Sequence, residues 1–309
     1  MKIVALAGGV GGAKLVHGLI QCLPPDDLTV VVNTADDFRH FGLHISPDLD
    51  TVCYTAAGLA NPEAGWGRGG ESWRTISEIA TLGGPDWFRL GDLDLATHLE
   101  RTRQLDDGQV LSDVVLSLCK AWRIKHRILP MTDQPVRTIV ETVEHGELAF
   151  QDYFVRLQCR PRVRGFRFDG AERASPAPGV LKRIAECGYV VICPSNPWVS
   201  IAPILAVPGI RPALTNKRVL AVSPIIGGKA LRGPAAKMYS ELGVTPSALA
   251  VAQHYRGLAT DFILDRVDGQ LEQEIESLNM RAAVMETIMQ SVEQRRRLAE
   301  AVLNFLKTA

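Results

Sequence analysis

The sequence has no excess of either charge and no long apolar run. Its 309 residues include 34 Lys and Arg against 34 Asp and Glu, which argues against the basic surface that nucleic acids require. No apolar run approaches the roughly 20 residues of a membrane-spanning helix, and the first residues lack the charge and apolar pattern of a signal peptide. We therefore expect a cytoplasmic protein with small-molecule partners, no nucleic acid and no membrane.

The cysteines form no C-x-x-C pair, so the sequence offers neither a zinc motif nor a dithiol redox motif. Most of them lie inside apolar segments, which favours buried free thiols: Cys22, Cys53, Cys119, Cys159, Cys187 and Cys193. Internal repeats and low-complexity linkers are also absent. With 46% hydrophobic residues, a chain of this length buries a large core in one or two domains.

Short apolar runs alternate with helical patterns at both ends of the chain. The runs, rich in Val, Ile and Leu, predict strands at 2–7, 28–32, 189–193, 218–222, 261–264 and 281–285. Helices are predicted at 14–22, 178–187, 234–242, 271–278 and 286–306. This alternation is typical of an α/β fold, in which a Rossmann-like parallel sheet carries helices on both faces.

The middle of the chain has a different pattern. Residues 137–154 contain two β-like runs around Glu144-His145-Gly146, which predicts an antiparallel hairpin, and a helical region at 94–123 precedes them. We interpret 86–170 as an inserted α+β lid region. Residues 1–85 and 171–309 then form the α/β core.

Four glycines mark the turn from the first strand into the first helix, in the sequence Ala-Leu-Ala-Gly-Gly-Val-Gly-Gly-Ala-Lys-Leu. Glycine lets backbone N–H groups approach a phosphate closely, and the positive end of the helix favours negative charge there. Lys14 stands where the dinucleotide fingerprint has its third glycine, and the Gly-Lys-Ser/Thr of a P-loop is absent. The turn therefore predicts a nucleotide loop of another kind.

Two acidic segments follow the second strand, Asn33 to Asp37 and Ser46 to Thr51. Both should lie at the carboxyl edge of the sheet, where α/β folds bind ligands, and carboxylates there could hold Mg²⁺. The candidates are two acidic pairs, Asp36 with Asp37 and Asp48 with Asp50. Capping explains them equally well, because Asp is a preferred N-cap residue and a helix-like run follows at 51–59. Asp36 or Asp37 could alternatively bind the ribose of a dinucleotide.

Polar residues appear abruptly after the strand at 189–193. Ser195, Asn196 and Ser200 lie in a turn stiffened by two prolines, and their short side chains suit a base, a ribose or a phosphate. A plain turn explains them equally well.

A similar arrangement follows the strand at 218–222. Gly227-Gly228-Lys229, with Arg232 nearby, forms a second candidate anion loop. The glycines could instead serve a tight turn.

The segment 87–101 mixes aromatic, acidic and basic residues. If it is helical from Asp94, then Thr97, His98 and Arg101 lie on neighbouring faces within about a turn and form a polar wall for a second substrate. A lone histidine is more often structural. No Ser-His-Asp or Cys-His arrangement supports covalent catalysis.

Taken together, these segments strongly resemble the 2-phospho-L-lactate transferase family of coenzyme F420 biosynthesis. The resemblance runs nearly end to end, through the blocks 8–14, 33–37, 46–51, 91–98, 193–200 and 223–234, with further matches at 128–133, 176–180 and 203–211. Trp198 departs from the pattern, because a smaller apolar residue is expected there.

The resemblance implies a magnesium-dependent transfer without redox chemistry. A phospholactyl or phosphoenolpyruvyl group would pass from lactyl- or enolpyruvyl-diphosphoguanosine to a ribityl hydroxyl of the deazaflavin Fo, forming F420-0 or its dehydro form and releasing GMP. Such transfer needs mainly positioning and charge neutralisation. We also expect a homodimer.

The resemblance also assigns roles to residues. Asp48 and Asp50 would hold Mg²⁺ and carry catalysis, with Asp36 assisting. The acceptor Fo would bind in the inserted region at Asp94, Thr97 and His98. The guanosine diphosphate part would contact Gly9, Gly11, Gly12, Lys14, Asn33, Ser195, Asn196, Ser200, Gly227, Gly228 and Lys229.

Two other functions stay open at this point. A related group of regulatory proteins shares the glycine-rich start and binds a nucleotide sugar without known turnover, although the block 91–98 favours the transferase. A nicotinamide dehydrogenase is disfavoured by Lys14.

Overall fold

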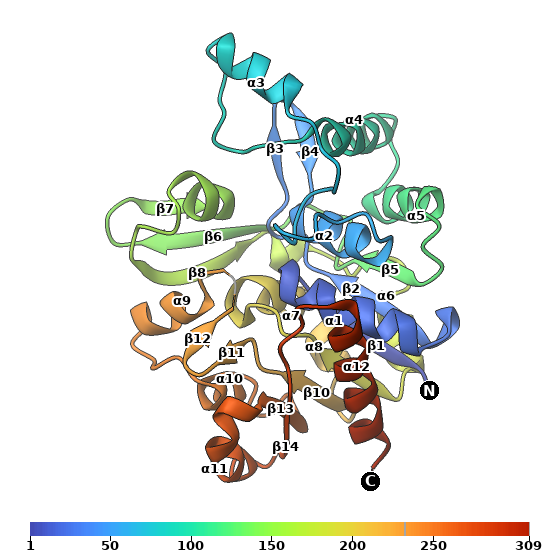
Figure 1. The fold of residues 1–309 in the computed structure, drawn as a ribbon, viewed down its shortest axis with the longest axis vertical. Helices are drawn as coiled ribbons and strands as arrows, with labels where there is room; N and C mark the ends of the chain where they lie inside the picture. The colour runs from blue at the N-terminus through green and yellow to red at the C-terminus, as the bar shows by residue number, and fades with distance from the viewer. Residues whose placement is uncertain (232, 309) are drawn as a thin grey trace.

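Seven parallel strands form the central sheet of the computed structural model, which describes residues 1–231 and 233–308 (Figure 1). Every pairing between neighbouring strands of this sheet is parallel. The spatial order is β14 Arg281–Met285, β13 Asp261–Asp265, β10 Arg218–Val222, β9 Tyr189–Ile192, β1 Ile3–Ala7, β2 Leu28–Val32 and β5 Arg127–Pro130. The sheet confirms the predicted Rossmann-like α/β architecture.

Helices cover both faces of the sheet, which is why β1, β2 and β13 are buried along their whole length. Apolar residues of one face pack with α1 Gly9–Cys22, α2 Pro47–Ala56, α5 Leu111–Ala121 and α12 Val292–Lys307. The other face packs with α6 Val180–Glu186, α7 Ala202–Ala206, α8 Ile210–Ala213, α9 Ala235–Glu241, α10 Ala248–His254 and α11 Glu272–Glu276.

Two helices begin at positions other than those predicted. α1 begins at Gly9 instead of residue 14, so the glycine-rich segment is the first turn of the helix itself. α12 begins at Val292 instead of residue 286, because Ser291 caps it: the Ser291 hydroxyl accepts from the Gln294 N–H, and the Gln294 side chain accepts from the Ser291 N–H.

The range predicted as an insertion, 86–170, contains one strand of the central sheet. β5 was not predicted, and it pairs with β2 at the edge of the sheet. The predicted helical region is two helices, α4 Asp92–Asp106 and α5. The predicted hairpin is confirmed as β6 Arg137–Thr142 and β7 Gly146–Ala149, and β8 Val163–Asp169 adds a third antiparallel strand beside β6 that the sequence analysis missed.

Smaller elements extend the sheet's carboxyl side. The hairpin of β3 Phe38–His40 and β4 Leu43–Ile45 rises from the body together with α3 Arg74–Thr81 (Figure 1). β11 Ile225–Ile226 and β12 Lys229–Ala230 form a second hairpin, and single turns of π-helix occur at Asp152–Arg156 and Pro197–Ile201. Short 3₁₀ turns lie at Pro25–Asp27, Ala171–Arg173 and Arg266–Leu271.

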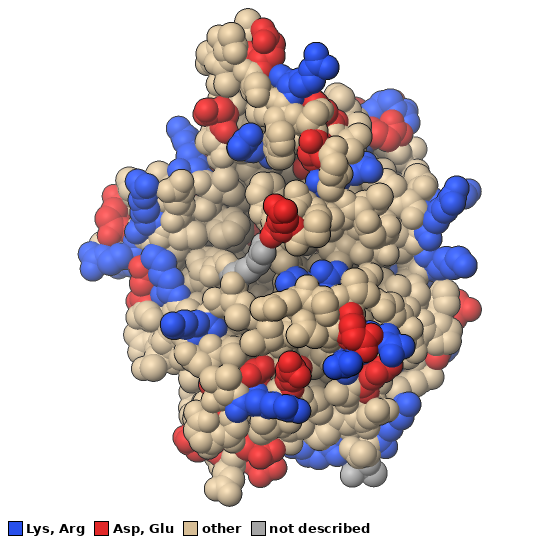
Figure 2. Space-filling model, viewed as in Figure 1, with Lys and Arg blue, Asp and Glu red and all other residues tan. Residues whose placement is uncertain are grey.

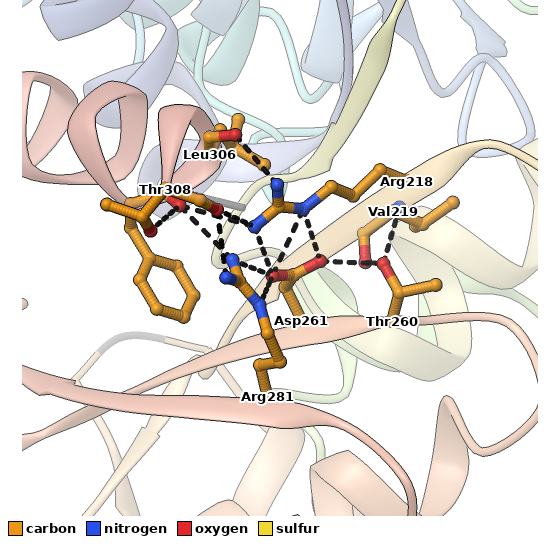
Figure 3. A network of polar contacts seen from close by, with 8 residues as sticks. Arg218, Val219, Thr260, Asp261, Arg281, Leu306 and Thr308 are labelled. Atoms are coloured by element: carbon orange, nitrogen blue, oxygen red, sulfur yellow. Dashed lines mark hydrogen bonds and ion pairs between the residues drawn. The ribbon is translucent and has the colours of Figure 1, made fainter.

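An ion network closes the opposite, amino side of the sheet. Figure 3 shows Arg218 of β10 and Arg281 of β14 pointing toward Asp261 of β13, which is 1% exposed. The Arg218 Nη2–Asp261 Oδ1 distance is 3.0 Å, and the guanidinium groups also donate to the backbone carbonyls of Leu306 and Thr308. The network thereby fastens the end of α12 to three strands.

Surface charge is mixed, as the composition predicts. Figure 2 shows basic and acidic side chains interspersed over one face of the molecule, without an extended area of one sign. Among the described residues, no helix is long and apolar enough to cross a membrane.

Candidate functional site

A cavity of about 720 Å³ lies at the carboxyl edge of the sheet, where the loops after β1, β2, β9, β10 and β14 meet. α4 and the π-helical turn after β7 complete its wall. Eleven of the predicted site residues line this cavity: Gly9, Gly11, Lys14, Asp36, Asp48, Asp50, Asp94, His98, Ser195, Asn196 and Ser200. The cavity therefore joins segments from both ends of the sequence, between Gly8 and Met289.

The glycine turn after β1 is bonded to the polar turn after β9. The Gly8 N–H donates to Ser195 Oγ at 3.1 Å, and the Ser195 hydroxyl donates to the Gly8 carbonyl at 2.8 Å. A Cβ at Gly11 would collide with the carbonyl oxygen of Pro194, and a Cβ at Gly12 would collide with Ser195 Oγ. Close packing therefore requires these two glycines, whatever the turn binds, and Gly12 lies outside the cavity wall.

Asp48 is held from two sides. Its Oδ1 accepts from the Gly9 N–H at 2.8 Å, and its Oδ2 accepts from Asn33 Nδ2 at 3.0 Å. The other end of the Asn33 side chain accepts from the Ala35 N–H at 2.9 Å. Asn33 does not line the cavity, so in this structure it positions Asp48.

Burial acts strongly on the two carboxylates at this side of the cavity. It raises the pKa of Asp48 to about 6, against the hydrogen bonds from Asn33 and Gly9. The pKa of Asp36 is raised well above its ordinary value, mainly by burial and to a smaller extent by the charge of Asp48. The Asp36 Oδ1 atom is buried and has no hydrogen-bond partner. Two facing carboxylates of this kind favour a proton or a cation between them.

Asp50 has a different environment, because an arginine lies against it. The Arg101 guanidinium, from α4, donates Nη1–H to Asp50 Oδ2 at 3.1 Å and Nη2–H to Asp50 Oδ1. His98 Nδ1 lies 3.2 Å from Arg101 Nη1 and 3.7 Å from Asp50 Oδ2. Arg101 is 1% exposed, so this is a buried ion pair between α2 and α4.

The network continues along α4. The Tyr54 hydroxyl donates to Asp94 Oδ1 at 2.7 Å, and His98 Nε2 lies 3.4 Å from the same oxygen. Burial alone would raise the pKa of Asp94, but contacts with His98 and Tyr54 and the charge of Arg101 lower it. Thr97 does not line the cavity, and its hydroxyl donates to the Leu93 carbonyl at 3.4 Å.

The second glycine turn lies outside the cavity. Gly227 and Gly228 form the tip of the β11–β12 hairpin, with φ of 55° and 75°, and Lys229 is exposed on β12. The Gly227 N–H already donates to both carboxylate oxygens of Asp268, at 3.1 and 3.0 Å. A tight turn therefore explains both glycines. Arg232, noted beside them, lies outside the described residues.

An aromatic wall of the cavity escaped the sequence analysis. Phe150 and Phe154 stack with ring centroids 5.4 Å apart, and Trp66, 50% exposed, stands at the rim between two glycines. Two features of the sequence could have predicted this wall. The two phenylalanines are four residues apart, and a tryptophan stands in the triplet Gly65-Trp66-Gly67. Other rings that reach the cavity are Tyr54 and Phe88.

No metal cluster is preformed in residues 1–231 and 233–308. Nowhere in these ranges do three or more His, Cys, Asp or Glu side chains gather in a way that could hold an ion. The carboxylates of the cavity come instead as the pair Asp36 and Asp48 and the arginine-bound Asp50.

The chain is similar to known transferases over almost its whole length. A family model described as 2-phospho-L-lactate transferase CofD matches residues 3–302. A phosphoenolpyruvate transferase of Streptomyces griseus is 44% identical over 98% of both chains. A 2-phospho-L-lactate transferase of Methanosarcina mazei is 40% identical over 97% of this chain and 99% of its own.

A solved structure shares the fold. A UPF0052 family member from Bacillus halodurans superposes with a TM-score of 0.64 at 15% identity, covering 98% of both chains. This likeness concerns the fold alone, whereas the family match and the identities above concern the sequence over almost the whole chain. The chain belongs to the 2-phospho-L-lactate transferase CofD family.

Proposed function

We propose that this chain transfers a phospholactyl or phosphoenolpyruvyl group from a diphosphoguanosine donor to the deazaflavin Fo and releases GMP. Family membership supports the transfer, and the names of the relatives supply the two candidate groups. The observation that carries the proposal is that one cavity joins a glycine turn at a helix N-terminus, buried carboxylates and an aromatic wall. These are the features that a nucleotide diphosphate, its charge and a planar acceptor require.

We assign the donor to the side formed by the turns after β1 and β9. There the first turn of α1 offers backbone N–H groups, Lys14 adds positive charge, and Ser195, Asn196 and Ser200 add short polar groups. Gly227, Gly228 and Lys229 are left out of this assignment, because they lie outside the cavity.

We assign Mg²⁺ to Asp36 and Asp48 in preference to Asp50. The unpartnered oxygen of Asp36 and the neighbouring charge of Asp48 fit a cation, whereas Arg101 already balances the charge of Asp50. Magnesium in phosphate-transfer sites often takes one or two carboxylates and completes its shell with water and substrate phosphate. When bound, it would neutralise the diphosphate and the departing GMP.

We assign the acceptor to the side formed by α4 and the aromatic wall. The planar ring of Fo would bury apolar area against rings such as Tyr54 and Phe88, and Asp94 and His98 would meet its polar groups. Asp50 lines the cavity, where its carboxylate can accept the proton of the ribityl hydroxyl of Fo. The ribityl oxygen forms a bond to the phosphorus that bears the three-carbon acid, and the bond from this phosphorus to the GMP oxygen breaks. The hydroxyl proton passes to Asp50.

The test is a reaction with Fo, MgCl₂ and each donor separately, with GMP and the new deazaflavin quantified by chromatography. GMP and product should form in equal amounts, and EDTA should stop both. The donor with the higher kcat/KM identifies the three-carbon acid. Saturable binding of a nucleotide sugar, without Fo binding or turnover, would overturn the proposal in favour of a regulatory protein.

A further inference from the structure

Arg101 is the largest fully buried side chain of the described residues. Arginine is almost never buried unless it is paired, and here both terminal nitrogens donate to the two oxygens of Asp50. Another arginine of the same helix, Arg103, is 58% exposed and pairs with Glu100 and Asp107 at the surface. The burial of Arg101 is therefore a feature of its position, not of the helix.

The surroundings of Arg101 hold it in one place. Its Nη1 also contacts the His44 carbonyl at 3.3 Å and His98 Nδ1 at 3.2 Å. Arg101 itself does not line the cavity, but Asp50 and His98 do. Any effect of Arg101 on a bound molecule must therefore pass through a neighbour, and Asp50 is the one that accepts from both of its terminal nitrogens.

A two-pronged contact fixes the plane of a carboxylate as well as its charge. Asp50 lies in the first turn of α2 two residues after Asp48, and both carboxylates line the same cavity as Asp36. The positive charge of the guanidinium also acts on the buried carboxylate of Asp37, whose pKa it lowers against the effect of burial.

We propose that Arg101 is a positioning residue of the transfer reaction, which holds the Asp50 carboxylate in one orientation toward the acceptor hydroxyl and keeps it from binding the cation. This inference rests on the proposed function. Arg101 acts through Asp50, so removing the arginine should matter only when Asp50 is present.

A double-mutant cycle tests this dependence. The variants are Arg101→Met, Arg101→Lys, Asp50→Asn and the double variant, with Arg103→Met as the matched control. Arg101→Met should lower kcat by about 100-fold, the size expected when a reacting group is misplaced by about 1 Å. Arg101→Lys should have a smaller loss, because lysine keeps the positive charge but cannot donate two parallel hydrogen bonds to the carboxylate. The double variant should be no slower than Asp50→Asn alone.

Measurements of Tm and of ligand affinity distinguish the positioning role of Arg101 from a purely structural role. Arg101→Met leaves a buried unpaired carboxylate and should lower Tm, whereas the double variant should regain Tm without regaining kcat. Titration of Fo fluorescence should show about tenfold weaker binding in Arg101→Met, with GDP affinity within about twofold of the wild type. Arg103→Met should change none of these quantities.

Two results would overturn the inference alone: a kcat loss in the double variant equal to the product of the single losses, or wild-type kcat in Arg101→Met. If Arg101→Met does not fold, the kcat of the double variant is compared with that of Asp50→Asn. A lower kcat in the double variant would then overturn the inference. Absence of turnover by the wild type with either donor would overturn the proposed function and the inference together.

Discussion

Asp36, Asp48 and Asp50 face one cavity, yet each has different partners. Asp50 is bound by arginine, Asp48 by an amide and a backbone N–H, and one oxygen of Asp36 has no partner. The cost of burying a carboxylate depends on such partners, so residues of one type have different affinities for a cation.

The raised pKa of Asp48 has a consequence for stability. Because the pKa in the folded protein, about 6, lies above the ordinary value of 3.8, the folded state binds the proton more tightly. Without divalent cations, this carboxylate should therefore cost stability progressively as pH rises from about 4 to about 6. In Asp48→Asn the amide cannot titrate, so this part of the pH dependence should disappear.

Thermal melts of both proteins at pH 5 and pH 7.5 in EDTA measure the effect. The stability of Asp48→Asn relative to the wild type should improve at the higher pH, by about 1.4 kcal/mol. Adding MgCl₂ should then raise the Tm of the wild type more than that of the variant. Equal pH dependence in the two proteins would contradict the assignment of this pKa to Asp48.

At the scale of elements, the start of α1 shows how packing and binding use the same residues. Its first turn packs against the turn after β9 so closely that Gly11 and Gly12 have no room for a side chain. The two turns that we assign to the donor are therefore one rigid unit, joined by the bonds between Gly8 and Ser195.

Gly11→Ala should separate these two turns. The added methyl group meets the Pro194 carbonyl oxygen, which is backbone and cannot turn aside. We expect a loss of about 1 to 3 kcal/mol in the free energy of unfolding, together with weaker GDP binding. Gly188→Ala is the control, because nothing lies within 4 Å of its Cβ position. Calorimetric GDP titration and urea unfolding measure both effects, and an unchanged GDP affinity would refute the rigid unit.

The loop that carries Trp66 is a second element with a defined shape. Gly65 and Gly67 adopt φ of 76° and 67°, and the Asn61 N–H donates to the Gly67 carbonyl at 3.0 Å. A half-exposed tryptophan held at a cavity rim leaves apolar surface in water that a planar ligand can cover.

Trp66→Ala should therefore raise the KM for Fo by about tenfold and leave GDP affinity unchanged. Trp66→Phe should keep most of the affinity, because a ring remains. Quenching of tryptophan fluorescence on Fo addition should fall in both variants, since the quenched ring is gone. A KM for Fo equal to that of the wild type in Trp66→Ala would remove this loop from the acceptor side.

At the scale of the whole molecule, the two ends of the central sheet carry different features. The carboxyl end carries the cavity, and the amino end carries the network of Arg218, Asp261 and Arg281 that fastens α12 (Figure 3). The ion network and the cavity thus lie at opposite ends of the same sheet.

Asp261→Ala should test this separation. It leaves two arginines close together without their shared carboxylate, and we expect a loss of about 3 to 5 kcal/mol in the free energy of unfolding. At a temperature where the variant is still folded, KM and kcat should match those of the wild type. A kcat loss there, with the fold intact by circular dichroism, would show that the two ends are coupled.

The homodimer and the cytoplasmic location stay predictions. Light scattering after gel filtration would decide the first, with a mass near twice the 33.7 kDa of the chain expected. Fractionation of the source cells would decide the second.

The sequence by itself determined the sheet, its covering helices and the family. Strands such as β1 and β2 are continuous apolar runs because both of their faces are buried, and such runs are visible without any knowledge of their neighbours. β5 was missed because it is short and begins with an exposed arginine at the sheet edge. The carboxylates and the turns after β1 and β9 were found because strand ends meet at one edge.

Only the tertiary structure decided which polar groups face the cavity and which face each other. Spacing along α4 groups Thr97, His98 and Arg101, but packing against α2 turns Arg101 onto Asp50 and leaves Thr97 outside. Gly228 resembles Gly9 in sequence, yet it ends a hairpin. The reason is physical: a residue type fixes which bonds are possible, whereas the partner that satisfies them comes from distant parts of the chain, whose arrangement no local pattern contains.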